Sequence, residues 1–260
     1  MNAENAEAAH ANPTAGVVII GNEILSGRTQ DTNIKFLAQR LAEKGIALRE
    51  VRIIPDEQEM IIATINEVRA RYTYVFTTGG IGPTHDDITS ECVAAAFGVP
   101  WEPHPEAWAL LERHYPPGEF NPARQRMATM PRGAKLIENP ISVAPGFSIG
   151  NVYVLAGVPR VMQAMFERLA ATLPGGRPIV SLAVHARNLP EGRIAGPLAE
   201  IQNRWPDIVI GSYPYYRADG SGVAIVAKGT DKASAEQAIQ EVMRMMRELG
   251  AEPVLGEPPV

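Results

Sequence analysis

The sequence holds a single cysteine, Cys92, which excludes an internal disulfide and suits a reducing cytoplasm. Cys92 stands beside Val93 and Ala94 on an expected helix, and no histidine shares its local pattern, so we expect a small buried side chain and no catalytic thiol. Basic residues are dispersed and the net charge is −5, so no polybasic surface favours a nucleic acid or a membrane as partner. Apolar runs fall far short of the ~20 residues that span a bilayer. These absences favour small-molecule chemistry in the cytoplasm.

The length of the chain allows one large domain or two ordinary ones. Its 260 residues are 45% hydrophobic, which is enough to bury a substantial core. Residues 1–14 are rich in alanine, asparagine and glutamate, lack the segments of a signal peptide, and are predicted to be a disordered tail. We expect an α/β domain over residues 15–173 and a small α+β domain over residues 178–260, with the proline- and glycine-rich residues 174–178 as the linker.

Strand and helix patterns alternate along the first domain. Short β-branched segments are followed by segments with apolar residues at helical spacing, which predicts right-handed crossovers onto a mostly parallel sheet. We therefore expect a three-layer α/β/α fold, and a βαββα order for the second domain. The expected strands are residues 15–20, 46–54, 72–78, 152–155, 179–184, 208–212 and 222–227, and the expected helices are residues 31–44, 56–71, 88–97, 105–114, 123–128, 159–173, 195–204 and 232–249.

The segment from Thr77 to Thr89, TTGGIGPTHDDIT, joins an expected strand to an expected helix. Glycines in such a turn let the backbone adopt a positive φ and approach a ligand, and the free amides at the helix start favour an anion. The lysine of a Walker A loop and the spacing of a dinucleotide-binding loop are both missing. Asp86 and Asp87 would repel a bare phosphate, so a divalent cation such as Mg²⁺ is the simplest way to reconcile them with a phosphate site. The alternative is a tight turn whose aspartates cap the next helix.

Two further loops are expected at the same rim of the sheet, because the carboxyl ends of parallel strands lie together. The first loop holds Asn22, Glu23 and Asp31, whose polar groups could bind a metal or ribose hydroxyls, although Asp31 also fits a helix N-cap. The second holds Asp56, for which a capping box with Glu59 and a catalytic role both stay open.

Three other polar residues are not assigned to the predicted site. His85 could donate to a phosphate or ligate a metal, but a solvated surface histidine fits equally well. Arg124 and Arg126 could steer a phosphate, but they fall on a short expected helix, and we expect both side chains to be solvated.

Six short motifs stand in separate segments that are spread along the chain after the tail. They are IGNEIL (residues 20–25), QDTN (30–33), TGGIGPTHDD (78–87), APGF (144–147), GVP (157–159) and GSYP (211–214). The first five of these motifs together resemble the CinA family, which includes the competence/damage-inducible protein, and the resemblance covers nearly the whole chain after the tail. The sequence is most similar to the molybdopterin-binding-like domain of eukaryotic FAD synthases, which shares the first two motifs and the last.

The resemblance implies a molybdopterin-binding fold for the first domain and points to two kinds of chemistry. One is a metal-dependent pyrophosphatase acting on ADP-ribose or FAD, with Mg²⁺ or another divalent metal such as Co²⁺, Mn²⁺ or Ni²⁺. The other is the adenylylation of molybdopterin by distant relatives, whose carboxylates match Asp87 and Asp56. The small domain resembles the KH-type region of CinA but has no Gly-x-x-Gly clamp, so we expect a structural or dimer-forming role. No counterpart of the nicotinamide mononucleotide deamidase domain is seen, so deamidase activity is not expected.

We therefore predict a metal-dependent hydrolase that splits the pyrophosphate of a nucleotide-diphosphate conjugate such as ADP-ribose or FAD, in a homo-oligomer (dimer or trimer). The alternatives are a protein that binds and adenylylates molybdopterin, and a module that only holds a pterin or nucleotide. A mere binding module does not need two carboxylates beside a phosphate loop. The predicted catalytic residues are Asp87, Asp56 and Asp86, of which Asp86 and Asp87 also hold the metal; the predicted binding residues are Thr78, Gly79, Gly80, Gly82, Thr84, Asn22, Glu23, Asp31, Gly157 and Pro159.

Overall fold

The computed structural model describes residues 12–217 and 220–258, which form two compact units with the main boundary between Gly176 and Arg177. Most of the expected tail, residues 1–11, lies outside the described residues, and the first strand already begins at Thr14. Each unit contains its own main sheet.

A six-stranded mixed sheet forms the centre of the first unit. Its strands are β1 (Thr14–Ile20), β2 (Ala47–Ile54), β3 (Tyr74–Thr78), β6 (Lys135–Ile137), β7 (Gly146–Ile149) and β8 (Val152–Leu155). They lie in the order β2-β1-β3-β8-β7-β6. The first four of these run parallel, and β7 runs antiparallel to both of its neighbours. The predicted mostly parallel sheet is confirmed.

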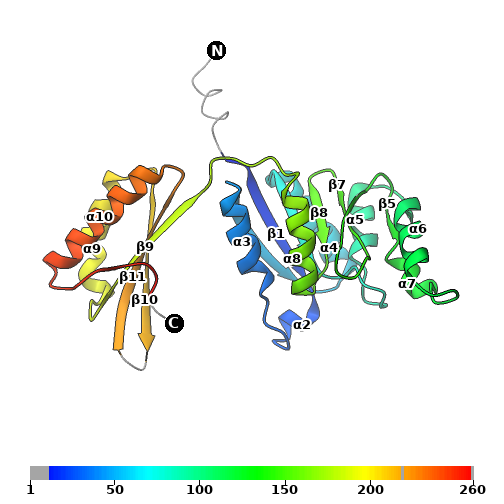
Figure 1. Ribbon diagram of the computed structural model, residues 1–260, viewed down its shortest axis with the longest axis horizontal. Helices are drawn as coiled ribbons and strands as arrows, with labels where there is room; N and C mark the ends of the chain where they lie inside the picture. Colours follow the sequence, from blue (N-terminus) through cyan, green and yellow to red (C-terminus); the bar gives the residue numbers. More distant parts are fainter. Residues whose placement is uncertain (1–11, 218–219, 259–260) are drawn as a thin grey trace, which may run out of the picture. The chain divides into compact units, whose positions relative to one another are not determined.

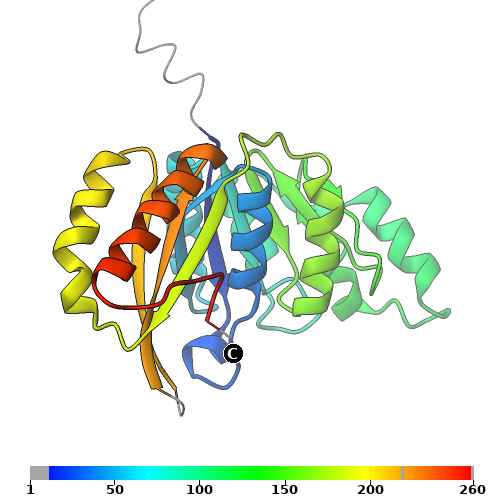
Figure 2. The same cartoon turned by 60° about the vertical axis from the view of Figure 1, so that its left-hand side comes forward.

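Alternate side chains of β1 pack on opposite faces of this sheet. Val18 and Ile20 join the core under α4 (Gln58–Arg71) and α5 (Thr89–Phe97). Val17 and Ile19 join a second core under α3 (Asn33–Glu43) and α8 (Pro159–Ala170). Both views in Figure 1 and Figure 2 place α3 and α8 on the same side of the sheet. The predicted three-layer α/β/α fold is therefore confirmed.

Between α5 and β7 the chain forms an accessory region that the sequence predicts only in part. An antiparallel ribbon pairs β4 (Trp101–Pro103) with β5 (Thr129–Pro131), and α6 (Pro105–His114) and α7 (Pro122–Arg126) lie between them in the chain. Both helices are expected from the sequence, but the strands from β4 to β7 are not. Three or four residues are too few to show the alternation that identifies a strand.

The second unit is a small antiparallel sheet with two helices on one face. Its elements are β9 (Val180–Arg187), α9 (Glu191–Arg204), β10 (Val209–Arg217), β11 (Gly220–Gly229), α10 (Lys232–Glu248) and β12 (Val254–Leu255). Val184, Val223 and Ile225 of the sheet share a core with Ile194 of α9 and Ile239 of α10. The strand order is β10-β11-β9-β12, so β10 is an edge strand, and it carries a proline at position 214. The α+β prediction for this unit is confirmed.

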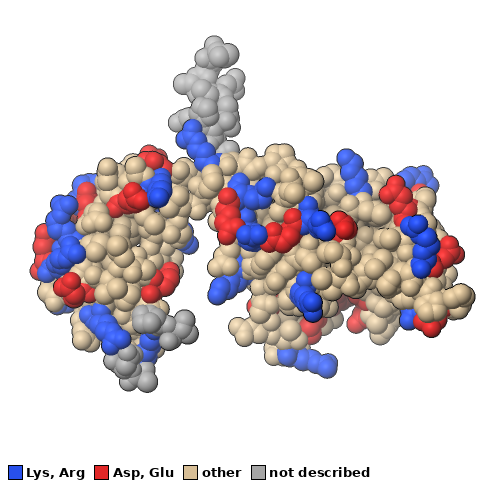
Figure 3. Space-filling view, in the orientation of Figure 1, with Lys and Arg blue, Asp and Glu red and all other residues tan. Residues whose placement is uncertain are grey.

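Charged side chains of both signs are interspersed over the surface of each unit on the face seen in Figure 3. Among residues 12–217 and 220–258, we find no helix with the length and apolar character needed to cross a membrane.

Cys92 lies buried on α5, as expected from its apolar neighbours. Burial raises the pKa of the Cys92 thiol to about 11, because the charged thiolate is disfavoured away from water. The thiol is therefore protonated near neutral pH and is a weak nucleophile. This protonation state agrees with a packing role for Cys92.

A chain shortened to end after Gly176 is expected to fold without the second unit. Both cores of the first unit are complete by Leu173, and the Tyr74 hydroxyl donates to the Pro174 carbonyl oxygen over 2.8 Å. Thermal unfolding followed by near-UV circular dichroism should show one cooperative transition. An insoluble product, or a gradual loss of signal without a transition, would mean that the first unit depends on the second for folding.

Candidate functional site

Four loops of the first unit meet at the carboxyl ends of β1, β2, β3 and β8. Because β2 and β3 lie on opposite sides of β1, the chain changes direction there, which opens a crevice beyond the strand ends. A cavity of about 520 Å³ occupies this place. The predicted site residues that line it are Glu23, Asp56, Gly79, Gly80, Gly82, Thr84, Asp86, Asp87, Gly157 and Pro159.

The floor of the cavity is made by glycine backbone. Gly79 has a φ of 101°, and a Cβ atom at this position would lie 2.1 Å from the carbonyl oxygen of Ile20. A Cβ atom on Gly157 would lie 3.2 Å from the Cα of Gly79. Gly80 has a φ of 67°, and its missing Cβ would meet the Thr89 hydroxyl at 2.1 Å. No side chain fits between these strand ends, so the ends of β1, β3 and β8 approach through their backbones.

Asp87 is held by the turn to which it belongs. Its Oδ2 accepts a hydrogen bond from the Thr84 amide over 2.8 Å and a second from the Thr84 hydroxyl. The neighbouring Asp86 is exposed, and the Thr84 hydroxyl, followed by a backbone amide, lowers the pKa of its carboxyl. Asp86 and Asp87 therefore present carboxylate oxygens along one turn at the mouth of the cavity.

Asp56 does not cap the helix that follows it, so the predicted capping box with Glu59 is wrong. The helix α4 begins at Gln58 with Glu57 at the N-cap, and no side chain bonds to its first amides. Asp56 Oδ2 instead accepts a hydrogen bond from the Asn22 amide over 2.9 Å, which joins the loop after β2 to the loop after β1. Long-range geometry thus overrides a local sequence pattern.

The environment of Asp56 disfavours its charge. Partial burial raises the pKa of Asp56, and the like charges of Glu23, Asp86 and Asp87 raise it further, although the Asn22 amide acts in the opposite direction. Four carboxylates line one cavity without a basic side chain among its lining residues.

Two carboxylates on the flank of the sheet, Glu50 and Glu67, are paired with arginines. The Tyr72 hydroxyl and then Arg52 lower the pKa of Glu50. Hydrogen bonds from Arg52 lower the pKa of the exposed Glu67 to about 2, and Arg71 lies within 3.2 Å of the same carboxylate. The four carboxylates of the cavity differ from these two, because no basic side chain is among the residues that line the cavity.

A divalent cation fits the chemistry of these donors, because Mg²⁺ and related ions prefer carboxylate oxygens and keep several water or phosphate ligands. In the part of the chain that the structure describes, no group of three or more histidine, cysteine or acidic side chains is placed to hold a metal by itself. Asp86 and Asp87 could supply two ligands, and substrate oxygens or water would have to complete the shell.

Three of the predicted binding residues do not line the cavity. Asp31 Oδ1 accepts a hydrogen bond from the Ile34 amide over 2.8 Å, so it caps α3, which is the alternative that the sequence left open. Thr78 is only 1% exposed at the end of β3. Asn22 contributes its backbone amide to Asp56, and its exposed side chain is not among the lining groups. His85 is likewise exposed on the turn and outside the cavity lining.

One loop of the cavity was missed by the sequence analysis as a source of site residues. Asn139 accepts from the Ile141 and Ser142 amides and donates to the Ser142 hydroxyl and the Ala144 carbonyl, so its side chain builds the loop. Val143 between them has a φ of 69°, which is rare for a β-branched residue. The APGF motif beginning at Ala144 was the available signal. The lining residues from outside the predicted set include Thr29, Met127, Asn139, Ser142, Ala144 and Val158.

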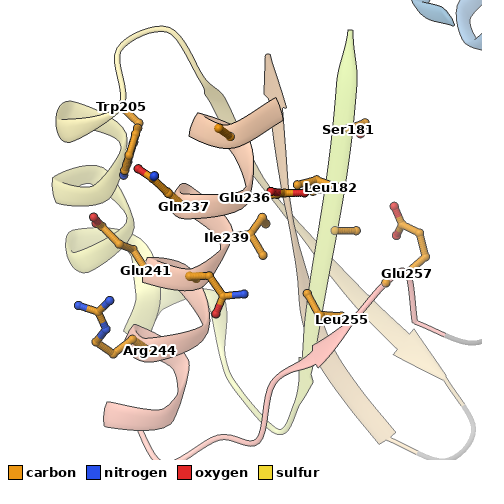
Figure 4. A pocket seen from close by; sticks show the side chains of 14 residues that line it. Ser181, Leu182, Trp205, Glu236, Gln237, Ile239, Glu241, Arg244, Leu255 and Glu257 are labelled. Atoms are coloured by element: carbon orange, nitrogen blue, oxygen red, sulfur yellow. The ribbon is translucent and has the colours of Figure 1, made fainter. Parts of the chain in front are cut away.

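A larger cavity of about 990 Å³ lies in the second unit (Figure 4). Gln237 and Glu241 of α10 and Trp205, directly after α9, approach it from one side, and Leu182 and Leu255 from the sheet. Its Glu241 is already paired with Arg204 at 2.9 Å. Size alone does not identify a functional site, whereas converging polar groups do. The smaller cavity, with its glycine backbone and four carboxylates, is therefore the better candidate.

The sequence of the first unit matches the family described as probable molybdopterin binding domain over residues 16–175. The chain belongs to this molybdopterin-binding domain family. The second unit matches the family described as FAD synthase, middle domain, over residues 179–254. These two matches confirm the resemblance to a molybdopterin-binding domain and to FAD synthases that the motifs predicted.

Individual relatives agree with this assignment. The chain is 34% identical over 248 residues to a protein of Pyrobaculum arsenaticum, a match that covers 90% of this chain and 94% of that protein. It is 31% identical to a CinA-like protein of Thermosynechococcus vestitus, covering 91% of this chain but 59% of that protein. A solved structure described as the protein CinA with unknown function, from Thermoplasma acidophilum, has 32% identity and a TM-score of 0.58, and the match covers 61% of this chain and 96% of that one. The resemblance to the CinA family is confirmed.

The close approach at Gly79 predicts a strong effect of one methyl group. Gly79→Ala should lower the free energy of unfolding by about 3 kcal/mol or more, because a strained φ costs roughly 1–3 kcal/mol and the new Cβ also meets the Ile20 carbonyl. Gly133→Ala is the matched control, since Gly133 has a φ of 83° and nothing within 4 Å of its Cβ position. Urea unfolding of the two variants separates backbone strain from the clash, and equal losses would contradict the close approach.

Asp56→Asn should stabilise the protein at pH 7. The pKa of Asp56 is raised in the folded state, so the folded protein binds the Asp56 proton more tightly than the unfolded chain does. The wild-type protein therefore loses stability as the pH rises through this pKa. Asparagine keeps an acceptor for the Asn22 amide and carries no charge. The gain in melting temperature should disappear as the pH falls below about 4, the usual pKa of aspartate.

Asp231→Asn provides a control of opposite sign. The Ser234 hydroxyl and amide lower the pKa of Asp231, so its charged form is favoured in the folded state and the variant should be less stable at pH 7. Melting curves from pH 4 to pH 8 check both expectations. A loss of stability in Asp56→Asn at pH 7 would show that the charge of Asp56 does not destabilise the folded state.

Proposed function

We propose that this protein is a divalent-cation-dependent hydrolase that splits the phosphoanhydride of a nucleotide-diphosphate conjugate of the ADP-ribose or FAD class. The observation that carries the proposal is the set of four carboxylates, Glu23, Asp56, Asp86 and Asp87, around a glycine-floored cavity. A site that only bound an anion would be weakened by these charges. A site that cleaves a phosphoanhydride with a cation and an oriented water uses them.

The residues of the chain divide into two roles in this proposal. The backbone of Gly79, Gly80 and Gly82 would let a diphosphate approach the start of α5, where the helix dipole favours negative charge. Asp86 and Asp87 would hold the cation, which when bound supplies positive charge to the phosphate oxygens. Asp56, whose Oδ2 accepts a hydrogen bond from the Asn22 amide, would accept the proton of the attacking water. Water adds to one phosphorus, the bridging P–O bond breaks, and two phosphate monoesters leave.

The molybdopterin-binding family match favours a second candidate, a domain that binds a pterin or adenylylates molybdopterin. Both candidates place a phosphate at the same glycine loop. They differ in the reaction, because the hydrolase consumes water and releases a nucleoside monophosphate, whereas the adenylylating protein consumes ATP and a pterin phosphate. A cytoplasmic location and a dimeric or trimeric state stay predictions.

A substrate panel separates these candidates. The full chain is incubated with ADP-ribose, FAD, NADH, or ATP plus molybdopterin, each with Mg²⁺, Mn²⁺, Co²⁺ or Ni²⁺, and the products are separated by chromatography. We expect monophosphate from ADP-ribose or FAD, no product in excess EDTA, and recovery on adding the cation. Full turnover in EDTA would contradict the cation-dependent mechanism. Adenylylated pterin without hydrolysis would support the second candidate.

Asp87→Asn should lower turnover by about 100-fold, which corresponds to roughly 2.7 kcal/mol of transition-state stabilisation. Asparagine keeps the size of the side chain and an acceptor for Thr84, so the melting temperature should change little. Asp207→Asn makes the same chemical change at an exposed position of the second unit and should leave turnover unchanged. Near-wild-type turnover of Asp87→Asn would remove Asp87 from the proposed mechanism.

A further inference from the structure

Arg126 reaches the turn that carries the proposed metal carboxylates. It is the last residue of α7, and its Nη2 donates a hydrogen bond to the Asp87 carbonyl oxygen over 3.1 Å. The centre of its guanidinium lies 5.1 Å from the centroid of the Trp101 ring. The sequence-based expectation that Arg126 is solvated is therefore wrong. The reason is that its partner lies 39 positions away in the chain.

Trp101, on which Arg126 rests, is itself fixed. The indole Nε1 donates to the Ser90 hydroxyl and to the Thr129 carbonyl, both over 3.0 Å. The Ser90 hydroxyl donates to the same Thr129 carbonyl over 2.9 Å. These bonds join the β4–β5 ribbon to the start of α5, directly after the turn. Arg126 thus connects the turn to a support that cannot easily move.

The neighbouring Arg124 takes another direction although it lies on the same short helix. Its guanidinium stacks on Tyr115 at 4.1 Å and pairs with Glu119 at 2.9 Å. The two arginines therefore have similar surroundings, each over an aromatic ring, and only Arg126 contacts the turn.

The Nε of Arg126 is buried, and no hydrogen-bond partner for it occurs in residues 12–217 or 220–258. A buried donor without a partner costs free energy, so the position of this guanidinium is not the one that best satisfies its own donors. The position does satisfy the Asp87 carbonyl. Such a cost is retained where a contact serves a function.

We propose that Arg126 is a positioning residue, which fixes the main chain of Asp87 and thereby the direction of its carboxylate. The side-chain bonds of Asp87 go to Thr84 in the same turn, so they move with the turn and cannot fix it to the sheet. The hydrogen bond from Arg126 to the Asp87 carbonyl oxygen joins the turn to a residue outside it. A planar guanidinium can stack on Trp101 and direct an N–H at the carbonyl at once, which lysine cannot do. The catalytic part of this inference rests on the proposed function of Asp87; the structural part does not.

Hydrogen–deuterium exchange of the full chain tests the structural part. In Arg126→Met the amides of residues 84–88 should exchange about tenfold faster, the change in local opening expected when a hydrogen bond from a charged donor is lost. Arg124→Met is the matched control and should leave this segment unchanged. Arg126→Lys keeps the charge but loses the planar guanidinium, so the amides of residues 84–88 should also exchange faster in this variant. Unchanged exchange in both Arg126 variants, or an equal increase in Arg124→Met, would overturn the proposal.

Kinetics and metal binding test the catalytic part. Arg126→Met and Arg126→Lys should lower kcat by about tenfold with little change in KM, because a misdirected carboxylate affects the reacting centre more than substrate binding. Binding of Mn²⁺ alone, measured by electron paramagnetic resonance, should weaken in the same variants and not in Arg124→Met. A loss of kcat with unchanged exchange at residues 84–88 would mean that Arg126 touches the substrate, which contradicts a positioning role. If the wild type neither binds Mn²⁺ nor cleaves any substrate, the proposed function fails, and exchange alone decides the structural part.

Discussion

The backbone approach at Gly79 is the constraint on which the first unit depends. The carbonyl oxygen of Ile20 at the end of β1 leaves no room for a Cβ atom on Gly79, and a Cβ atom on Gly157, after β8, would be in tight contact with the Gly79 Cα. The carboxyl ends of β1, β3 and β8 can therefore lie close together, and so do the starts of the loops that follow these strands. The carboxylates of the cavity stand on the loops that follow β1, β2 and β3: Glu23 and Asp56 three and two residues beyond the ends of β1 and β2, and Asp86 and Asp87 eight and nine residues beyond the end of β3. The site is thus a product of sheet geometry, to which the loops add the chemical groups.

The sequence predicts those parts of the structure that depend on local patterns. Hydrophobic periodicity identifies the parallel strands and their helices, and the glycines after Thr78 identify the turn, because few other residues tolerate its backbone angles. It fails where contacts join distant segments. Asp56 has the spacing of a capping box, but its partner is an amide 34 positions away. Arg126 has the setting of a solvated charge on a short helix, and nothing local indicates that Trp101 and Asp87 surround it.

The pKa of Asp56 in the cavity and the pKa values of Glu50 and Glu67 on the flank of the same unit are shifted in opposite directions. On the flank of the sheet, the Tyr72 hydroxyl and then Arg52 lower the pKa of Glu50, and hydrogen bonds from Arg52 lower the pKa of Glu67. At the rim, partial burial raises the pKa of Asp56, and the three like charges of the same cavity raise it further. Natural proteins commonly retain such unfavourable local arrangements at functional positions and offset them elsewhere in the fold. The contrast is a physical reason to look for function at the rim.

The second unit presents a long edge strand, β10, and such an edge offers unpaired backbone groups to other chains. Pro214 stands near the middle of this strand, opposite Val223 of β11. Proline has no N–H, and within sheets it is tolerated at edges where its nitrogen faces away from the neighbouring strand. Near its middle, β10 therefore offers one hydrogen-bond donor fewer to a strand that would pair with this edge. The GSYP motif, which ends at this proline, thus makes β10 a poorer template for a further strand than an edge without proline.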